Sequence, residues 1–317
     1  MQKEHCRKWN KVSIPEGEGS MFKQMRDEKI AHIENVLKKY LPKEEGYAAK
    51  VMEAMNYSVL AGGKRLRPML MEETYKMFGG NGEEIEPFMA AQEMIHTYSL
   101  VHDDLPCMDN DEYRRGRKTT HAVYGEGMAV LAGDALLNYA FETACKAFSV
   151  TDDVQKAAKA LTVLAGKAGI YGMIGGQTAD IMAEETPSEN VTKELLMYIH
   201  ENKTAALIQS SMMIGATLAG ADENQINDIE KVGYNIGIAF QIQDDILDVT
   251  GTFEELGKPI GSDEKNDKVT CVSLMGLEKA KEEVMRLSNE AVALLNNMTF
   301  EHTFLEELIL DLIHRNN

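Results

Sequence analysis

Residues 277–297, LEKAKEEVMRLSNEAVALLNN, repeat an apolar side chain every three or four positions. The repeating positions are Leu277, Ala280, Val284, Leu287, Ala291 and Leu294. This spacing follows the 3.6-residue period of an α-helix and places the six on one face, opposite a charged face. Residues 22–40, which Pro42 ends, and residues 304–313 show the same pattern. The sequence therefore predicts helices that pack through apolar stripes.

The chain between these segments alternates long helical stretches with short breaks rich in glycine and charged residues. The sequence contains neither a convincing series of alternating strands with hairpin turns nor a Ser- or Pro-rich linker. We therefore predict an all-α fold, with residues 21–317 forming one large helical bundle. Residues 1–20 contain no apolar run, so we expect a loose N-terminal extension that ends where the helical pattern begins at Met21.

Composition argues against several classes of function. Lys and Arg number 33 against 51 Asp and Glu, a formal net charge of −18, whereas nucleic acids and anionic membranes require a basic surface. Residues 204–221 are uncharged and just long enough to span a membrane, but their Gln, Ser, Thr and Gly residues favour a buried helix. Cys6, Cys107, Cys145 and Cys271 are scattered and form no zinc-type spacing with each other or with His. This distribution is typical of reduced thiols in a cytoplasmic protein.

Carboxylates are concentrated at two places in apolar surroundings, where an unpaired charge is costly. Asp244 and Asp248 are four residues apart, so both project from one helix face and repel each other unless a cation is present. Pro106 disfavours continuation of the helix that carries Asp103 and Asp104. Asp109 is therefore expected to return toward these two residues from a turn. Clustered Asp without His or Cys suits a hard cation such as Mg²⁺. We therefore interpret the clusters as two metal-holding walls of one cleft. They are SLVHDDLPCMDND (99–111), with Asp103, Asp104 and Asp109, and FQIQDDILD (240–248), with Asp244, Asp245 and Asp248.

Basic residues occur in groups in this otherwise acidic chain. Clustered Arg favours a fork-like grip on phosphate oxygens. The segment GGKRLRP (62–68) lacks the Walker spacing and follows no strand, so the pattern indicates a diphosphate rather than a nucleotide. Within it, Arg65 is expected to point outwards, since it lies two positions before Arg67. The basic candidates are Lys64, Arg65, Arg67, Arg114, Arg115, Lys203 and Lys258.

Six spaced motifs give the chain a family resemblance over roughly residues 48–268. In this order they are GGKRLRP (62–68), EMIHTYSLVHDDLPCMDNDEYRRGR (93–117), GEGMAVLAGDALL (125–137), GGQTAD (175–180), HENKTAAL (200–207) and FQIQDDILDVTG (240–251). The chain resembles the trans-isoprenyl diphosphate synthases and, within them, the bacterial farnesyl diphosphate synthases. The resemblance implies an all-α homodimer with its active site in a central helix-lined cavity.

The resemblance also implies an activity. An allylic diphosphate, dimethylallyl or geranyl, ionises with Mg²⁺ bound, and its carbocation alkylates isopentenyl diphosphate before a proton is lost. The released diphosphate is the base, so no side chain is assigned that role. The expected metal ligands are Asp103, Asp109 and Asp244, with Asp104 and Asp248 in support. The expected allylic-substrate residues are Arg114, Lys203, Thr204, Gln241 and Lys258. The expected isopentenyl diphosphate residues are Lys64, Arg67, His96 and Arg115. The expected catalytic residues are Asp103, Asp104, Asp109, Arg114, Lys203, Asp244 and Lys258.

Two side chains on the predicted helix that precedes Asp103 bear on product length. On a helix, Ser99 lies about 6 Å and Tyr98 about 7.5 Å below Asp103. A bulky ring there would form a floor under the growing hydrocarbon, and in the resembling family an aromatic at this place accompanies fifteen-carbon products. We hypothesise that Tyr98 truncates the pocket, although Met128 or Met173 could also set its depth.

Four other functions remain open at the level of sequence. A geranylgeranyl diphosphate synthase would differ only in product length. A class I terpene cyclase would need no second diphosphate site, and a cyclase pocket would be expected to carry more aromatics than the 7% found here. A catalytically silent regulatory subunit would be expected to have lost one aspartate cluster. A plain metal-buffering protein would bind Mg²⁺ but not isopentenyl diphosphate.

Overall fold

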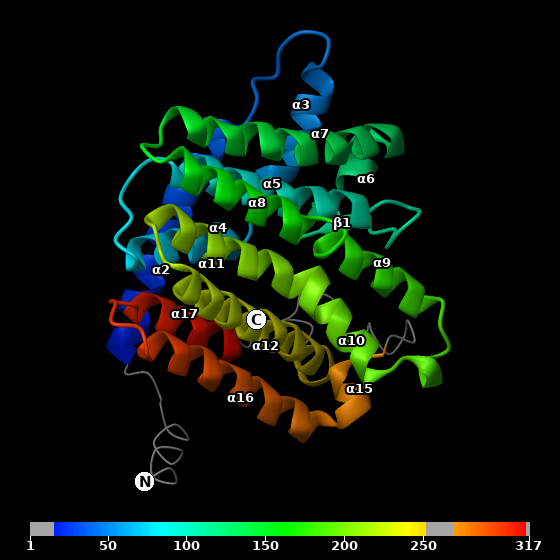
Figure 1. Ribbon diagram of the computed structural model, residues 1–317. Coiled ribbons are helices and arrows are strands. Elements are labelled where there is room, and N and C mark those ends of the chain that lie inside the picture. Colours follow the sequence, from blue (N-terminus) through cyan, green and yellow to red (C-terminus); the bar gives the residue numbers. More distant parts are fainter. Residues whose placement is uncertain (1–15, 252–268, 315–317) are drawn as a thin grey trace.

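The computed structural model describes residues 16–251 and 269–314, which are mostly helical with almost no strand (Figure 1). The prediction of an all-α fold is confirmed. The α-helices are α2 (Glu16–Tyr40), α3 (Ala49–Val59), α4 (Leu66–Met77), α5 (Ile85–Asp103), α6 (Thr120–Tyr124), α7 (Glu126–Cys145), α8 (Val154–Ala168), α9 (Met173–Glu184), α10 (Lys193–Ile199), α11 (Ala206–Ala219), α12 (Glu223–Thr250), α15 (Cys271–Met275), α16 (Leu277–Asn296) and α17 (Thr303–His314). Shorter elements are the 3₁₀ turns η2 (Lys146–Ser149) and η3 (Ser188–Asn190), the π-helical turn η4 (His200–Ala205), and strands β1 (Tyr113–Arg114) and β2 (Arg117–Lys118).

Helix α11 lies at the centre of the bundle, where it packs against α4, α8 and α12 (Figure 1). Nearly all of its residues are buried, which confirms that the uncharged stretch 204–221 contributes a core helix. None of the helices in the described part of the chain is long and apolar enough to span a membrane. The remaining large contacts join α5 to α7 and α12 to α16.

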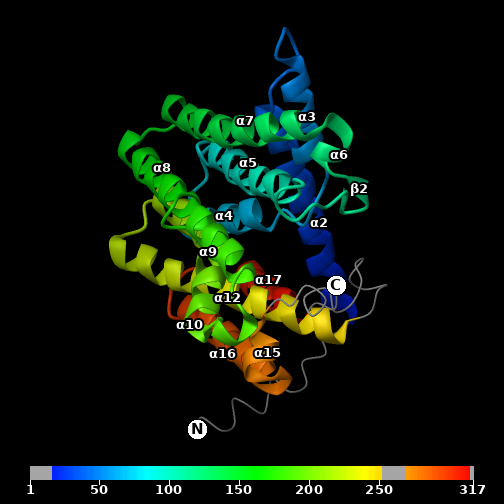
Figure 2. The same ribbon diagram turned by 90° about the vertical axis from the view of Figure 1, so that its right-hand side faces the viewer.

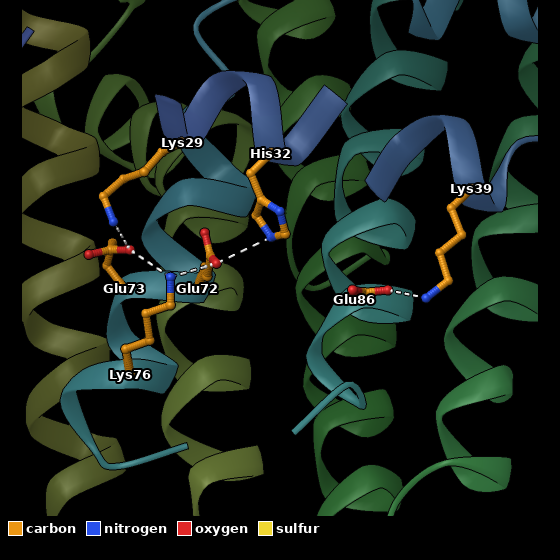
Figure 3. A network of polar contacts seen from close by, with 7 residues as sticks. All are labelled: Lys29, His32, Lys39, Glu72, Glu73, Lys76 and Glu86. Carbon is orange, nitrogen blue, oxygen red and sulfur yellow. Dashed lines mark hydrogen bonds and ion pairs between the residues drawn. The ribbon is translucent and has the colours of Figure 1, made fainter. Parts of the chain in front are cut away.

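The predicted apolar stripes are mostly correct. On α16, four of the six predicted positions are buried, whereas Leu277 and Leu294 are only half-buried and Leu295 occupies the core in place of Leu294. Helix α2 begins at Glu16, earlier than the expected start at Met21, and residues 1–15 of the expected extension lie outside the described residues. Ion pairs join α2 to α4 and α5. Lys29 Nζ lies 2.5 Å from Glu73 of α4, and Lys39 Nζ lies 2.6 Å from Glu86 of α5 (Figure 3). The same network of polar contacts includes His32, Glu72 and Lys76 (Figure 3).

A short antiparallel hairpin, which the sequence pattern did not predict, follows the first aspartate cluster. Strands β1 and β2 pair Tyr113 with Lys118 and Arg114 with Arg117. Arg115 and Gly116 form the turn with φ of 54° and 73°, the left-handed backbone that a two-residue hairpin turn requires. The hairpin therefore fixes where the twin arginines at 114 and 115 leave the backbone.

Candidate active site

The first aspartate cluster lies at the C-terminal end of α5. The helix ends at Asp103, and the chain turns back so that the Asp109 N–H donates to the Asp103 carbonyl at 2.8 Å. The expectation that a turn returns Asp109 to the cluster is therefore confirmed. Burial raises the pKa of the Asp103 carboxyl to about 6; the Lys203 ammonium opposes this rise and the Asp109 carboxylate adds to it. Asp103 is thus a desolvated carboxylate beside a like charge, at a site that favours a cation.

Asp104 points to a different partner from Asp103. Its side chain is buried, and Arg114 Nε donates to one Asp104 oxygen at 2.7 Å, while Arg114 Nη2 forms an ion pair with the same oxygen at 2.6 Å. Burial raises the pKa of Asp104, while the Arg114 hydrogen bond lowers it. The β1–β2 hairpin is therefore tied to the end of α5 through this ion pair.

The second aspartate cluster occupies the last turns of α12. Asp248 is 2% exposed and Asp244 is half-buried. One turn earlier, Gln241 accepts a hydrogen bond from the Thr204 hydroxyl at 2.9 Å. Asp245 faces α15, where its carboxylate accepts the Cys271 N–H at 2.8 Å. The C-terminal ends of α5 and α12 lie on the same side of the molecule (Figure 2).

Helix α9 and the turn η4 connect the two clusters. From α9, Gln177 donates to Asp103 at 3.0 Å, and Asp180 accepts from Lys203 Nζ at 2.5 Å. The π-helical turn η4 carries Lys203 and Thr204, and such turns often occur at functional sites. A Cβ at Gly176 would lie 2.1 Å from the Lys203 backbone nitrogen, so α9 approaches η4 this closely because residue 176 is glycine.

The sequence reasoning missed Gln177 and Asp180 as site residues. Both belong to the motif GGQTAD (175–180), which contributed only to the family resemblance. The available signal was two polar residues three positions apart on a helix of small residues, a spacing that places them on one face. Their partners, Asp103 and Lys203, are 74 and 23 positions away.

A basic wall of Arg67, His96 and Arg115 lies beside the aspartates. Burial lowers the pKa of Arg67 to about 10, Glu93 opposing and Arg115 adding to the effect. Burial lowers the pKa of His96 well below its ordinary value, and the arginines, Arg67 foremost, lower it further. Arg67 Nε is buried without a hydrogen-bond partner among the described residues. Closely spaced cationic side chains and an unpaired guanidinium N–H favour the binding of an anion.

Arg65 corrects one expectation from the sequence. Instead of pointing outwards it is 2% exposed, with Nε 2.7 Å from Glu34 and Nη1 2.7 Å from Glu93. Its Nη2 also donates to the Val59 carbonyl at 2.7 Å. Arg65 therefore holds α2, α3 and α5 together, and Arg67 is the arginine of this segment that belongs to the basic wall.

The predicted floor residue, Tyr98, is 6% exposed on α5 below Asp103. Its ring meets the His102 ring edge-on at 5.8 Å, and its buried hydroxyl has no partner among the described residues. Burial and nearby Asp103 raise the pKa of Tyr98 to about 12. Ser99 donates to the His96 carbonyl at 2.9 Å. Lys64 is exposed, and Lys258 lies outside the described residues.

The donor chemistry of the aspartate clusters fits Mg²⁺. Asp103, Asp109 and Asp244 offer only carboxylate oxygens, the ligands that a hard cation prefers. The raised pKa of Asp103 is an independent sign, because it shows a carboxylate that burial has left short of compensating positive charge. The expected metal residues therefore suit the expected ion.

Comparisons of the sequence and of the structure with known proteins all indicate the same family. The family described as polyprenyl synthetase matches residues 48–300. A farnesyl diphosphate synthase of Geobacillus stearothermophilus is 43% identical over 82% of this chain and 86% of its own. A geranylgeranyl diphosphate synthase of Cyanophora paradoxa is 42% identical over 83% of this chain and 90% of its own. The crystal structure of a Zymomonas mobilis FPP/GFPP synthase superposes with a TM-score of 0.80 at 32% identity, covering 92% of this chain and 98% of that one. With its all-helical fold and paired aspartate clusters, the chain belongs to the polyprenyl synthetase family and is a prenyltransferase.

Proposed function

We propose that this prenyltransferase makes farnesyl diphosphate from isopentenyl diphosphate and the allylic diphosphates dimethylallyl and geranyl diphosphate. The observation that carries the proposal is the Tyr98 ring, buried on α5 just over one turn below Asp103. A rigid ring at that depth would leave room for a short hydrocarbon tail and block a longer one. The sequence hypothesis about Tyr98 therefore stays a proposal, now with a buried position to support it.

The basic wall is proposed to hold isopentenyl diphosphate without a metal. Arg67 would donate its unpaired Nε–H to a phosphate oxygen, and Arg115 would contribute a second guanidinium. His96, kept neutral by its lowered pKa, would donate one ring N–H and add no further positive charge. Lys64, exposed at the start of the same segment, is proposed to complete this site.

The allylic diphosphate is proposed to bind between the aspartate clusters. Lys203, held by Asp180, would place its ammonium toward the oxygens of the diphosphate, and Thr204 would turn its hydroxyl from Gln241 to donate to them as well. Arg114, anchored on Asp104, would add a third, and Lys258 remains a proposal from the sequence alone. Mg²⁺ bound by Asp103, Asp109 and Asp244, with Asp104 and Asp248 in support, would offset the negative charge on the departing diphosphate. The apolar helices around these groups would exclude water from the carbocation.

A geranylgeranyl diphosphate synthase is the second candidate. Relatives with that name are as similar to this chain as those named for farnesyl diphosphate. The same two diphosphate sites would serve both reactions. The candidates differ only in the depth of the pocket below Asp103.

Product analysis tests the proposed function. The purified chain is incubated with Mg²⁺, isopentenyl diphosphate and dimethylallyl diphosphate, and the products are read by mass spectrometry. We expect a fifteen-carbon diphosphate that disappears when EDTA is added. A twenty-carbon product would favour the second candidate. Failure to form any prenyl diphosphate would contradict both and support a silent subunit.

Magnesium binding is expected to depend on pH through Asp103. The ionised carboxylate is the ligand, and its pKa in the cation-free protein is raised to about 6. Below that pH a proton competes with the cation, so we expect Mg²⁺ affinity to fall by about tenfold per pH unit. Calorimetric Mg²⁺ titrations between pH 5 and pH 8 would show it, with circular dichroism as a control for the fold. An affinity that stays constant between pH 6 and pH 5 would contradict the assignment.

Asp180 is expected to act as a positioning residue for Lys203. Changing Asp180→Asn removes the charge that holds the Lys203 ammonium at 2.5 Å. The lost charge-assisted bond should lower kcat/KM for the allylic substrate by about 10- to 100-fold. The KM for isopentenyl diphosphate should change little, whereas general structural damage would affect both substrates. Thr178→Ala, at an exposed position of the same helix, is the matched control.

A homodimer is proposed from the exposed apolar side chains of α7, α8 and the α8–α9 connection. Leu131 is 55% exposed, Val154 51%, Ile170 66% and Tyr171 88%, and large exposed apolar side chains are candidates for burial against a second copy of the chain. Leu131→Glu is expected to shift the sedimenting species from dimer to monomer in analytical ultracentrifugation. Met285→Glu on α16, a similarly apolar and exposed position, should leave the dimer intact. A monomeric parent protein would contradict the proposal.

A further inference from the structure

A group of metal-type donors of mixed chemistry lies in the core and includes Asp245, the residue that directly follows Asp244 of the second aspartate cluster. His200 of η4, Asp245 of α12 and Cys271 of α15 bring one nitrogen, one oxygen and one sulfur within 4.8 Å of one another. All three side chains are buried, with exposed fractions of 5%, 5% and 1%. Among the side chains that the structure describes, no other group of three His, Cys, Asp or Glu residues brings its donor atoms this close together.

We propose that His200, Asp245 and Cys271 form a binding site for a borderline-soft divalent cation such as Zn²⁺. Thiolate, imidazole and carboxylate are the ligand types that zinc takes in proteins, whereas Mg²⁺ and Ca²⁺ take oxygen alone. The chain would therefore hold two kinds of cation at neighbouring aspartates. Asp244 serves the hard ion of the active site, and Asp245 serves the softer ion behind it.

The arrangement of the three donors is close to what zinc requires. Cys271 Sγ lies 3.8 Å from His200 Nδ1. Zinc bonds of about 2.3 Å to sulfur and 2.0 Å to nitrogen place these atoms about 3.5 Å apart in a tetrahedron, so a small movement closes the site. The Cys271 N–H already orients the Asp245 carboxylate through its 2.8 Å hydrogen bond. Three protein ligands leave the fourth position to water.

A nucleophilic role for Cys271 does not fit the same observations. Its thiol is 1% exposed, so a substrate has no access to it. Burial raises the pKa of the Cys271 thiol to about 12, and the Asp245 carboxylate adds to the rise. A cation at the site would instead displace the thiol proton to solvent and compensate both the thiolate and the carboxylate. Cation binding uses all three groups, whereas a nucleophile would use one.

The place of the cluster in the fold indicates what bound zinc would do. His200 lies three residues before Lys203, and Asp245 directly follows Asp244. A cation shared by η4, α12 and α15 would fix these backbone segments against one another. The proposed site is thus a structural clamp beneath one wall of the active site, and it does not rest on the identity of the product. Local spacing could not reveal it, since Cys271 lies 26 positions from Asp245 and 71 from His200.

The test uses full-length protein freed of metal with EDTA and titrated with Co²⁺, a spectroscopic substitute for Zn²⁺. We expect one equivalent of Co²⁺ to produce a thiolate-to-cobalt charge-transfer band, and Zn²⁺ to remove that band by displacement. Cys271→Ser should abolish the band. His200→Gln should weaken binding at least about 100-fold, because even residues that only orient ligands contribute about 10- to 100-fold.

Matched variants separate this site from the other thiols and from the active site. Cys6→Ser, Cys107→Ser and Cys145→Ser should leave the band unchanged, as should Asp103→Asn. The absence of a band, or a band that survives Cys271→Ser, would overturn the proposal. X-ray absorption of the parent protein with one equivalent of Zn²⁺ gives a test that needs no variant. One sulfur neighbour at about 2.3 Å is expected, and a shell of only nitrogen and oxygen would overturn the assignment.

Discussion

Replacing Asp103 with asparagine is expected to lower turnover by at least about 10²- to 10³-fold, the usual cost of removing one group that stabilises transition-state charge. Asn keeps the size of the side chain and an oxygen that can still accept the hydrogen bond from Gln177. It removes the negative charge that would hold the cation beside the leaving diphosphate. Steady-state kinetics over a range of Mg²⁺ concentrations measures the effect, and excess Mg²⁺ should restore only part of the activity.

Stability provides a second readout for the same variant. The raised pKa of Asp103 shows that its charge is unfavourable in the folded, cation-free protein. Asp103→Asn should therefore unfold at the same temperature as the parent protein, or at a higher one, when Mg²⁺ is absent. A loss of activity together with a large fall in Tm would indicate structural damage and contradict the role assigned to Asp103.

Asp111→Asn is the matched control for this prediction. Asp111 lies two residues beyond Asp109, is exposed, and approaches Arg114 only to 3.7 Å. Its removal changes the net charge of the segment as much as Asp103→Asn does. We expect its turnover to stay within about threefold of the parent, since a weak exposed ion pair contributes little.

The sequence predicted those features that depend on local periodicity. The apolar repeat of α16 and the turn after Pro106 are properties of neighbouring residues, and both are present in the structure. Arg65 shows that local patterns do not predict contacts between distant segments of the chain. The spacing of Arg65 and Arg67 correctly indicated different directions, but Glu34 and Glu93, which draw Arg65 inward, come from helices far away in the sequence. Asp180 was missed for the same reason, because only the folded chain places it beside Lys203.

Replacing Tyr98 with alanine is expected to change the main product from fifteen to twenty carbons. The Tyr98 ring is 6% exposed and packs edge-on against His102. Its removal would open space below Asp103, where the tail of a fifteen-carbon allylic substrate could extend for one more condensation. Product chain length, measured by mass spectrometry, is the readout. An empty cavity of this kind costs about 3–5 kcal/mol of stability, so the Tm of the variant must be measured as well.

Tyr98→Phe is the matched control, and it separates the ring from the hydroxyl. The buried Tyr98 hydroxyl has no hydrogen-bond partner among the described residues, so its loss removes a desolvated polar group and breaks no bond. Phe keeps the floor, and this variant should make the fifteen-carbon product with unchanged or higher stability. A fifteen-carbon product from a folded Tyr98→Ala variant would place the floor at another residue, with Met128 and Met173 the first to examine. A change of product in Tyr98→Phe would instead mean that the hydroxyl, and not the bulk of the ring, limits the chain.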